Sequence, residues 1–181
     1  MTLLIILAVL ILSLPLTILT FILIKSKFKP FLIAENFRTM WHKVQVFRFM
    51  WRTMIKLFKR AWVHDLSKFS SEEAPYFAKA KGLKNLEYGS KEYKKMIKET
   101  LKPALDHHYA KNSHHPEHHE NGFNDMSLLD QLEMLCDWKA ATLRTKGGDI
   151  KESIEFNKDR FGYSEDTKKK FIEFLKDINA Y

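Results

Sequence analysis

Histidines are concentrated in one short segment of the chain. Six of the eight histidines lie between His107 and Glu120, in the sequence HHYAKNSHHPEHHE, and none follows this segment. Neutral imidazole is the commonest metal ligand in proteins, and carboxylate is its usual companion. Upstream, His64 is directly followed by Asp65, and Asp137 comes later. These residue types predict a metal centre, and a solvated His-rich loop is the alternative that the segment alone leaves open.

The carboxylates next to these histidines limit how an ion could be held. Neighbouring side chains near a helix end diverge by about 100°, so His64 and Asp65 can address one ion only from a bent terminus, or can bridge two ions. Glu133 and Asp137 share a helix face at i and i+4, so one can ligate while the other orients a ligand or a water molecule.

The paired histidines present a second geometric choice. His107 and His108 precede His114 and His115 by seven residues, about two turns if the helix continued, and a break before Ser113 could bring the pairs closer. The pattern leaves open which member of each pair ligates. His42 falls off the apolar face of its own predicted helix, so the pattern fits a surface histidine and a ligand equally well.

Helical periodicity supplies the elements that would position these candidates. Amphipathic helices are predicted over residues 35–63, from Ser70 onward, and over residues 91–109, 127–142, 149–160 and 164–178. No period-two strand pattern, internal repeat or Gly-rich phosphate loop occurs. The prediction is an all-α fold.

The long helix over residues 35–63 has a sevenfold apolar repeat. Its apolar positions are Phe37, Val44, Trp51 and Phe58, with Met40, Phe47, Met54 and Ala61 at the complementary position. This pattern predicts one broad stripe facing a core, with most Lys and Arg side chains on a solvated face.

Several local signals predict where the other helices begin, bend and face. Ser70 with Glu73 has the form of a capping box, and Pro103 predicts a kink or restart. The region from residue 81 to 89 is predicted to be a loop, and the helix before the second histidine pair is expected to end near Asn112. On the helix over residues 127–142, Leu128, Leu129, Leu132, Leu135 and Cys136 are predicted to face inward.

The first apolar segment predicts a membrane anchor. Leu3 to Ile24 contains no charged residue and would form a helix roughly 33 Å long, enough to cross a bilayer core. A cleaved signal peptide is the alternative, but the segment is too long and lacks a basic n-region and a small-x-small site. Lys25, Lys27 and Lys29 follow at once, so the positive-inside rule places the rest of the chain in the cytoplasm. The expected division is an anchor with its basic flank over residues 1–29 and a helical domain over residues 30–181.

Charge and cysteine content narrow the classes of partner. The formal net charge is +8, and ten Lys or Arg but only one acid, Glu35, occur from Lys25 to Arg60. This placement favours an anionic membrane surface or an anionic substrate, and nucleic acid is not expected as a partner. Cys136 is the only cysteine, which excludes an internal disulfide and fits a reducing compartment.

Four segments together carry a resemblance: HDLSKFS, a following HH, KNSHHPEHHE and EMLCDWKAA. The chain resembles an uncharacterised bacterial and phage family of small helical proteins, whose signature is HDLSKFS, HH with N-x-HH, and a later DW. The resemblance covers roughly His42 to Asn157 and leaves out the predicted span. The order His, His-Asp, His, His-His, Asp is also similar to the HD superfamily, whose members are mainly metal-dependent phosphohydrolases. An HD-like helical bundle is the fold that this implies.

The HD resemblance implies a set of ligands and a reaction. The implied ligands of one ion are His42, His64, Asp65 and Asp137, and those of a second are His108 with His114 or His115. Asp65 and Lys68 are the implied catalytic residues, because the frame His-Asp-x-x-Lys matches a lysine that contacts substrate phosphate.

Three functions are compatible with these residues. The first is a membrane-anchored phosphohydrolase that uses one or two divalent ions, Mn²⁺, Mg²⁺, Fe²⁺ or Zn²⁺, to cleave a nucleotide or another phosphate ester. The second is an HD-type di-iron oxygenase, which by resemblance has the same arrangement of ligands. The third is a membrane-tethered metal-binding or interaction module without catalysis.

Overall fold

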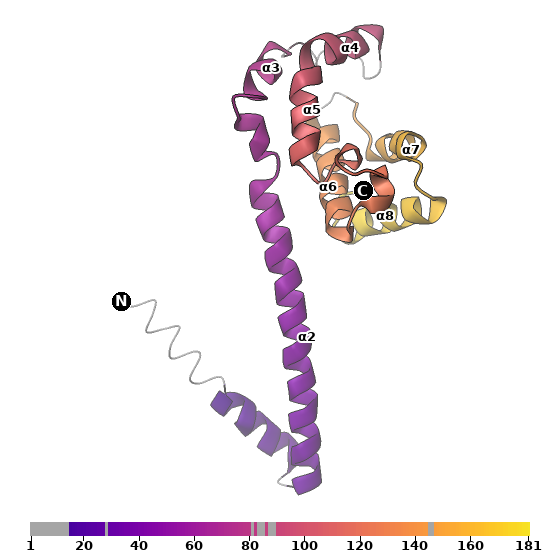
Figure 1. The fold of residues 1–181 in the computed structure, drawn as a ribbon. Coiled ribbons are helices and arrows are strands. Elements are labelled where there is room, and N and C mark those ends of the chain that lie inside the picture. Colours follow the sequence, from indigo (N-terminus) through magenta and orange to yellow (C-terminus); the bar gives the residue numbers. More distant parts are fainter. Residues whose placement is uncertain (1–14, 28, 81, 83–85, 87–89, 145–146) are drawn as a thin grey trace. The chain divides into compact units, whose positions relative to one another are not determined.

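A computed structural model of the chain describes residues 15–181, apart from positions 28, 81, 83–85, 87–89 and 145–146. The chain divides into two compact units, Met1–Lys56 and Leu57–Tyr181, and the division falls within one long helix. All regular elements among the described residues are helical, and none is a strand (Figure 1). The predicted all-α fold is therefore confirmed for the described part of the chain.

The predicted membrane span falls largely on residues 1–14, which lie outside the described residues. The described remainder of the span, residues 15–24, belongs to a helix that continues to residue 26. Its buried Ser26 hydroxyl donates to the Ile22 carbonyl oxygen (2.5 Å) and accepts from the Asn36 amide (2.7 Å), which links this helix to the next one within the first unit. No helix within the described ranges is both long and apolar enough to cross a bilayer.

Helix α2 runs from Pro30 to Val63 and so begins earlier than predicted. Proline suits the first turn of a helix, because the N–H group that it lacks would have no partner there. The prediction that the apolar stripe faces a core is wrong, because no residue of α2 is buried, and Trp41 and Phe47 are 65% and 64% exposed. A sevenfold repeat shows that one helix face is apolar, but it does not require another element to cover that face.

Short helices lead from α2 to the histidine-rich segment. These are η1 (Leu66–Phe69), α3 (Ala74–Lys79), α4 (Lys91–Met96), a π-helical turn η3 (Ile97–Leu101) and α5 (Lys102–Lys111). Pro103 lies in the first turn of α5, as its restart prediction requires, and α5 ends just before Asn112, also as predicted. The helix predicted from Ser70 instead begins at Ala74, and most of the predicted loop at residues 81–89 lies outside the described residues.

The last three helices enclose the apolar core of the second unit. They are α6 (Leu128–Arg144), α7 (Ile150–Phe161) and α8 (Glu165–Asp177), close to their predicted bounds. Side chains of Asp149 and Ser164 cap α7 and α8, each accepting from a backbone N–H of the first turn. The buried core residues are Phe123, Met126, Met134, Leu135, Ile150, Ile154, Tyr163, Phe171 and Leu175.

Helix α6 has an apolar face and an acidic face. Met134 and Leu135 are buried in the core, whereas Asp130, Glu133 and Asp137 recur at i, i+3 and i+7 on a neighbouring face. The packed face therefore fixes the orientation of the acidic one. Two of the side chains predicted to point inward on this helix do not: Leu128 is 69% exposed, and Cys136 is exposed.

Candidate metal centre

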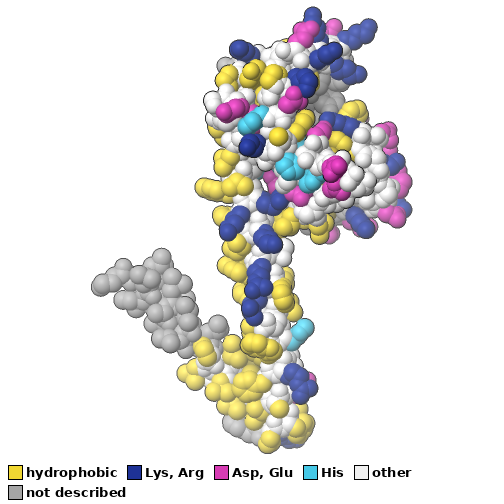
Figure 2. All heavy atoms as spheres, viewed as in Figure 1, with side chains coloured by type: hydrophobic (Ala, Val, Ile, Leu, Met, Phe, Trp, Pro, Cys, Tyr) yellow, Lys and Arg dark blue, Asp and Glu magenta, His cyan; other side chains and the backbone are white. Residues whose placement is uncertain are grey.

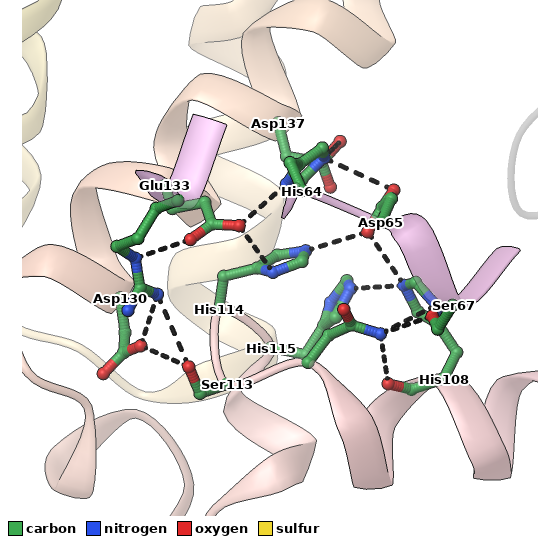
Figure 3. A network of polar contacts seen from close by, with 12 residues as sticks. His64, Asp65, Ser67, His108, Ser113, His114, His115, Asp130, Glu133 and Asp137 are labelled. Carbon is green, nitrogen blue, oxygen red and sulfur yellow. Dashed lines mark hydrogen bonds and ion pairs between the residues drawn. The ribbon is translucent and has the colours of Figure 1, made fainter. Parts of the chain in front are cut away.

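Histidine and aspartate side chains from four parts of the second unit converge beside α6 (Figure 3). One group comprises Asp65, His108, His114 and His115, and the other comprises His64, His114 and Asp137. Within each group the candidate ligand atoms all lie within 4.8 Å of one another. The residues come from the segment that follows α2, from α5, from the segment after α5 and from α6.

Asp65 lies between the two groups because the chain bends sharply where α2 ends. Its φ of 55° is in the left-handed region, which aspartate tolerates better than most residues. Oδ1 lies 3.3 Å from Nε2 of His108 and 3.4 Å from Nε2 of His114, whereas Oδ2 lies 3.3 Å from Nε2 of His64. The bend at the end of α2, one of the two geometries that the sequence allowed, therefore lets His64 and Asp65 share one site.

Glu133 orients two of the histidines at once. Its Oε1 atom lies 2.8 Å from Nδ1 of His64 and 3.1 Å from Nδ1 of His114, so each ring donates its Nδ1–H group to the same carboxylate oxygen. The Nε2 atoms of both rings are then directed at Asp65, and that of His64 also lies 3.6 Å from Asp137. Carboxylates that hold the second nitrogen of a histidine in this way are typical of metal sites.

Arg60, at the end of α2, anchors this glutamate from behind. Its guanidinium lies 2.6 Å from Oε2 of Glu133 and 2.5 Å from Oδ1 of Asp130. The Ser113 hydroxyl donates to the same Asp130 oxygen (2.6 Å). The orienting carboxylate is therefore held in place by an ion-pair network that also ties the loop after α5 to α6.

Glu73 orients a third histidine from the opposite side. Its carboxylate is fully buried and accepts from Nδ1 of His108 (2.9 Å) and Nδ1 of His107 (2.7 Å). Nε2 of His108 then faces Asp65 and Nε2 of His115, the latter at 3.0 Å. Three imidazoles thus have Nδ1 fixed by a glutamate and Nε2 pointing inward.

The electrostatics of the cluster favour a bound cation. Hydrogen bonds to Asp137, Asp65 and Glu133 raise the pKa of His64 to about 11. Burial, with the neighbouring charges of two other histidines, lowers the pKa of His115 to about 3. Although burial opposes the shift, the histidine rings that surround them hold the pKa values of Asp65 and Glu133 well below their usual range. The acids therefore stay ionised and attract positive charge to the space between them.

Two buried polar atoms at the centre of the cluster have no hydrogen-bond partner. They are Oδ1 of Asp65 and Nε2 of His114, 3.4 Å apart. Buried polar atoms are nearly always satisfied, so such an unpaired pair needs an explanation. An oxygen and an imidazole nitrogen that face one gap are suitable donors for a divalent transition metal. The residues present therefore fit a metal ion.

The structure brings most of the predicted ligands together. The residues that join the two groups are His64, Asp65, His108, His114, His115 and Asp137. His107 joins neither group and pairs with Glu73 instead. His42 is exposed on α2, in the other compact unit and about six helical turns before the end of that helix, and it also belongs to neither group.

Glu73 and Arg60 are residues of the cluster that the sequence pattern missed. Glu73 was predicted to close a capping box with Ser70, but its side chain makes no cap and binds two histidines. Its three-residue spacing from a serine is also the spacing of a helix start, so the local signal was ambiguous. Arg60 is one of many basic residues on α2, and only the ion pairs to Asp130 and Glu133 distinguish it.

These observations define a class of protein: an all-α protein with His/Asp groups that can hold a metal ion. The chain belongs to the family described as family of unknown function DUF5662, whose profile matches residues 33–179. No curated protein and no solved structure matches the chain significantly.

Proposed function

We propose that this protein is a divalent-metal-dependent phosphohydrolase of the HD type that cleaves a nucleotide or another phosphate ester. The observation that supports this most directly is the position of Asp65, which directs one carboxylate oxygen toward each of the two candidate ligand groups. A carboxylate placed in this way can be shared by two ions, the arrangement used in two-metal hydrolysis of phosphate esters.

The chain's own residues would prepare the site for this chemistry. When bound, one or two divalent ions lower the pKa of a water molecule and polarise a phosphoryl oxygen. Glu133 and Glu73 would hold the Nδ1–H groups of the ligating rings, so that Nε2 is the nitrogen that faces the ions in each. The ion pair between Arg60 and Glu133 would help to hold this carboxylate in position. The cluster is thus preorganised, which lowers the cost of binding the ions.

Lys68 would contact the substrate in this proposal. Its ammonium pairs with Oδ2 of Asp65, lies 5.7 Å from the centre of the Phe77 ring, and is about one third exposed (34%). A cation at the edge of the cluster can neutralise charge that develops on a phosphate. A cation at this position suits an anionic substrate such as a phosphate ester.

The proposal includes a tether. Residues 3–24 would cross a bilayer, and the basic residues that follow would keep the catalytic domain on the cytoplasmic side. Anchoring would place the enzyme near a substrate produced at or delivered to the membrane.

The test measures metal content and turnover of the full chain in detergent or lipid. Elemental analysis after loading with Mn²⁺, Mg²⁺, Fe²⁺ or Zn²⁺ comes first, followed by a screen of nucleotides and other phosphate esters for phosphate release. Lys68→Gln should keep the metal but lower turnover by about 10²–10³-fold, as loss of one charge-stabilising donor does. Lys59→Gln, on the exposed surface of α2, is the matched control.

The alternatives give different results in the same experiment. Iron binding with substrate-dependent oxygen consumption and no phosphate release would identify the oxygenase. Metal binding without turnover on any ester, together with unfolding when the metal is removed, would identify a structural module. No bound metal under any loading condition would overturn both enzymatic functions.

A further inference from the structure

Helix α2 carries an uncovered apolar face in the first compact unit. Phe47, Met50, Trp51 and Met54 are spaced three and four residues apart and therefore share one side of the helix. Their exposed fractions are 64%, 67%, 50% and 48%, and the rings of Phe47 and Trp51 stack with centroids 6.0 Å apart. A patch of this kind, with aromatic side chains at its centre, usually marks an interaction surface.

A basic row accompanies this face. Arg48, Arg52 and Lys56 follow one another at intervals of four residues, all exposed, and lie about 150° round the helix from the apolar face. Figure 2 shows Lys and Arg side chains and hydrophobic side chains side by side at the surface along α2. Glu35 is the one acid of this helix, and it already pairs with Arg38 at 3.2 Å.

We propose that α2 lies along the surface of an anionic phospholipid bilayer, with its apolar face at the boundary between headgroups and acyl chains. An apolar face rich in Phe and Trp, opposite a basic face, is the composition of helices that lie in this interface. Tryptophan prefers headgroup depth, and long basic side chains can extend along the helix toward the phosphates. Each Lys or Arg near such a surface adds attraction.

Charge decides between the bilayer and a second copy of the chain. The sevenfold repeat through Trp51 would also suit a coiled coil. Paired helices of that kind are usually joined by opposite charges beside the seam, but here the charged residues beside the seam are Lys43 and Arg48, and no acid occurs there. Two copies would therefore bring like charges together, whereas phosphate groups complement them. The inference does not depend on the metal cluster or on the predicted span.

The experiment measures which face of α2 meets lipid in the full chain. A fluorophore is attached at Met54→Cys or, as a matched control about 180° round the helix, at Gln45→Cys, both in a Cys136→Ser background. The labelled proteins are reconstituted into nanodiscs of phosphatidylcholine alone or with phosphatidylglycerol. Quenching by iodide in water is compared with quenching by spin-labelled lipid.

If α2 lies on an anionic bilayer, the Met54 label should be shielded from iodide and quenched by spin-labelled lipid only in the phosphatidylglycerol discs. The Gln45 label should stay open to iodide in both. Replacing Arg48, Arg52 and Lys56 by Gln should weaken the contact by on the order of a hundredfold, since each basic residue contributes about fivefold. Equal iodide access in both discs overturns the proposal. So does shielding without anionic lipid, whether it comes with a dimer, which assigns the face to a second copy, or with a monomer, which assigns it to another part of the chain.

Discussion

Two sets of histidines in the same segment have different surroundings. His108 and His114 are buried, have Nδ1 fixed by a glutamate, and point Nε2 at Asp65. His118 and His119, only a few residues on, bond through one ring nitrogen to backbone carbonyl groups at 2.9 and 2.8 Å and join neither ligand group. Among these four rings, carboxylates supplied by distant elements, and not the density of histidines, separate the candidate ligands from the structural rings.

The largest expected effect comes from the carboxylate between the two groups. Asp65→Asn keeps the left-handed backbone, which asparagine also tolerates, but removes the charge and one ligand oxygen. We expect metal affinity to fall by more than about 100-fold, because even changes behind the ligands cost 10–100-fold, and turnover to become undetectable. Elemental analysis, turnover and circular dichroism measure these effects.

The matched control is Asp106→Asn, an exposed carboxylate on α5 that pairs with Lys102. It should bind metal like the unaltered protein. Equal metal content in the two variants would contradict the assignment of Asp65.

Removing an orienting glutamate should have the next largest effect. Glu133→Gln should lower metal affinity by about 10–100-fold, because the acceptor that fixes the Nδ1–H groups of two imidazoles loses its negative charge. Glu73→Gln should have a smaller effect, since it orients only one member of the ligand groups, His108. Titration with Mn²⁺ or Zn²⁺ measures both. The reverse order of effects would sink the idea that Glu133 is the main orienting residue, and Glu117→Gln, outside the cluster, provides the baseline.

The pH dependence should differ between metal-free and metal-loaded protein. The pKa of His64 is raised from 6.5 to about 11 in the metal-free fold, so its contribution to stability is complete below about pH 6.5 and is lost as the pH rises toward 11. A ligating imidazole must be deprotonated, so metal binding displaces this proton and strengthens with rising pH. The metal-free melting temperature should therefore fall between pH 6.5 and 9.5 while the shift caused by metal grows.

The matched variant for the pH experiment is His64→Gln. It should lose most of the pH dependence of the metal-free melting temperature in this window. A metal-free melting temperature that is flat with pH in the unaltered protein would show that His64 does not carry the raised pKa.

The smallest effects are expected for two exposed histidines, and they test whether His42 is a ligand, as the HD resemblance implies, or lies outside the site, as the structure shows. His42→Ala and His118→Ala should leave metal content and melting temperature nearly unchanged, because exposed side chains away from the cluster seldom matter for stability. The HD resemblance instead implies a ligand at His42. A loss of metal in His42→Ala comparable to that in His64→Ala would restore that assignment.

The sequence predicted the features that depend on local chemistry. Asp149 and Ser164 marked helix starts, Pro103 marked a restart, and the motif His64-Asp65 marked the centre of the site. These signals are short in range, because caps and prolines act within one turn.

What the sequence could not predict depends on contacts between distant segments. The partners of Glu73 are more than thirty residues away, at the end of α5, and nothing in its neighbourhood distinguishes it from a helix cap. The prediction that the apolar stripe of α2 faces a core was wrong for the same reason, because whether another element covers a helix face depends on distant segments. Which face of α6 packs and which binds histidines is likewise decided by α7, α8 and the segment after α5.

The π-helical turn η3 sets the direction in which the side chains of α5 point. A turn of this kind accommodates one residue more than an α-helical turn, so α5 starts about 100° away from the direction that a regular helix would give. The angular position of His108 therefore depends on a residue count made about two turns earlier. Deleting one residue between Ile97 and Leu101 would restore regular winding and swing this ring away from Asp65, although every residue of the histidine segment would be intact.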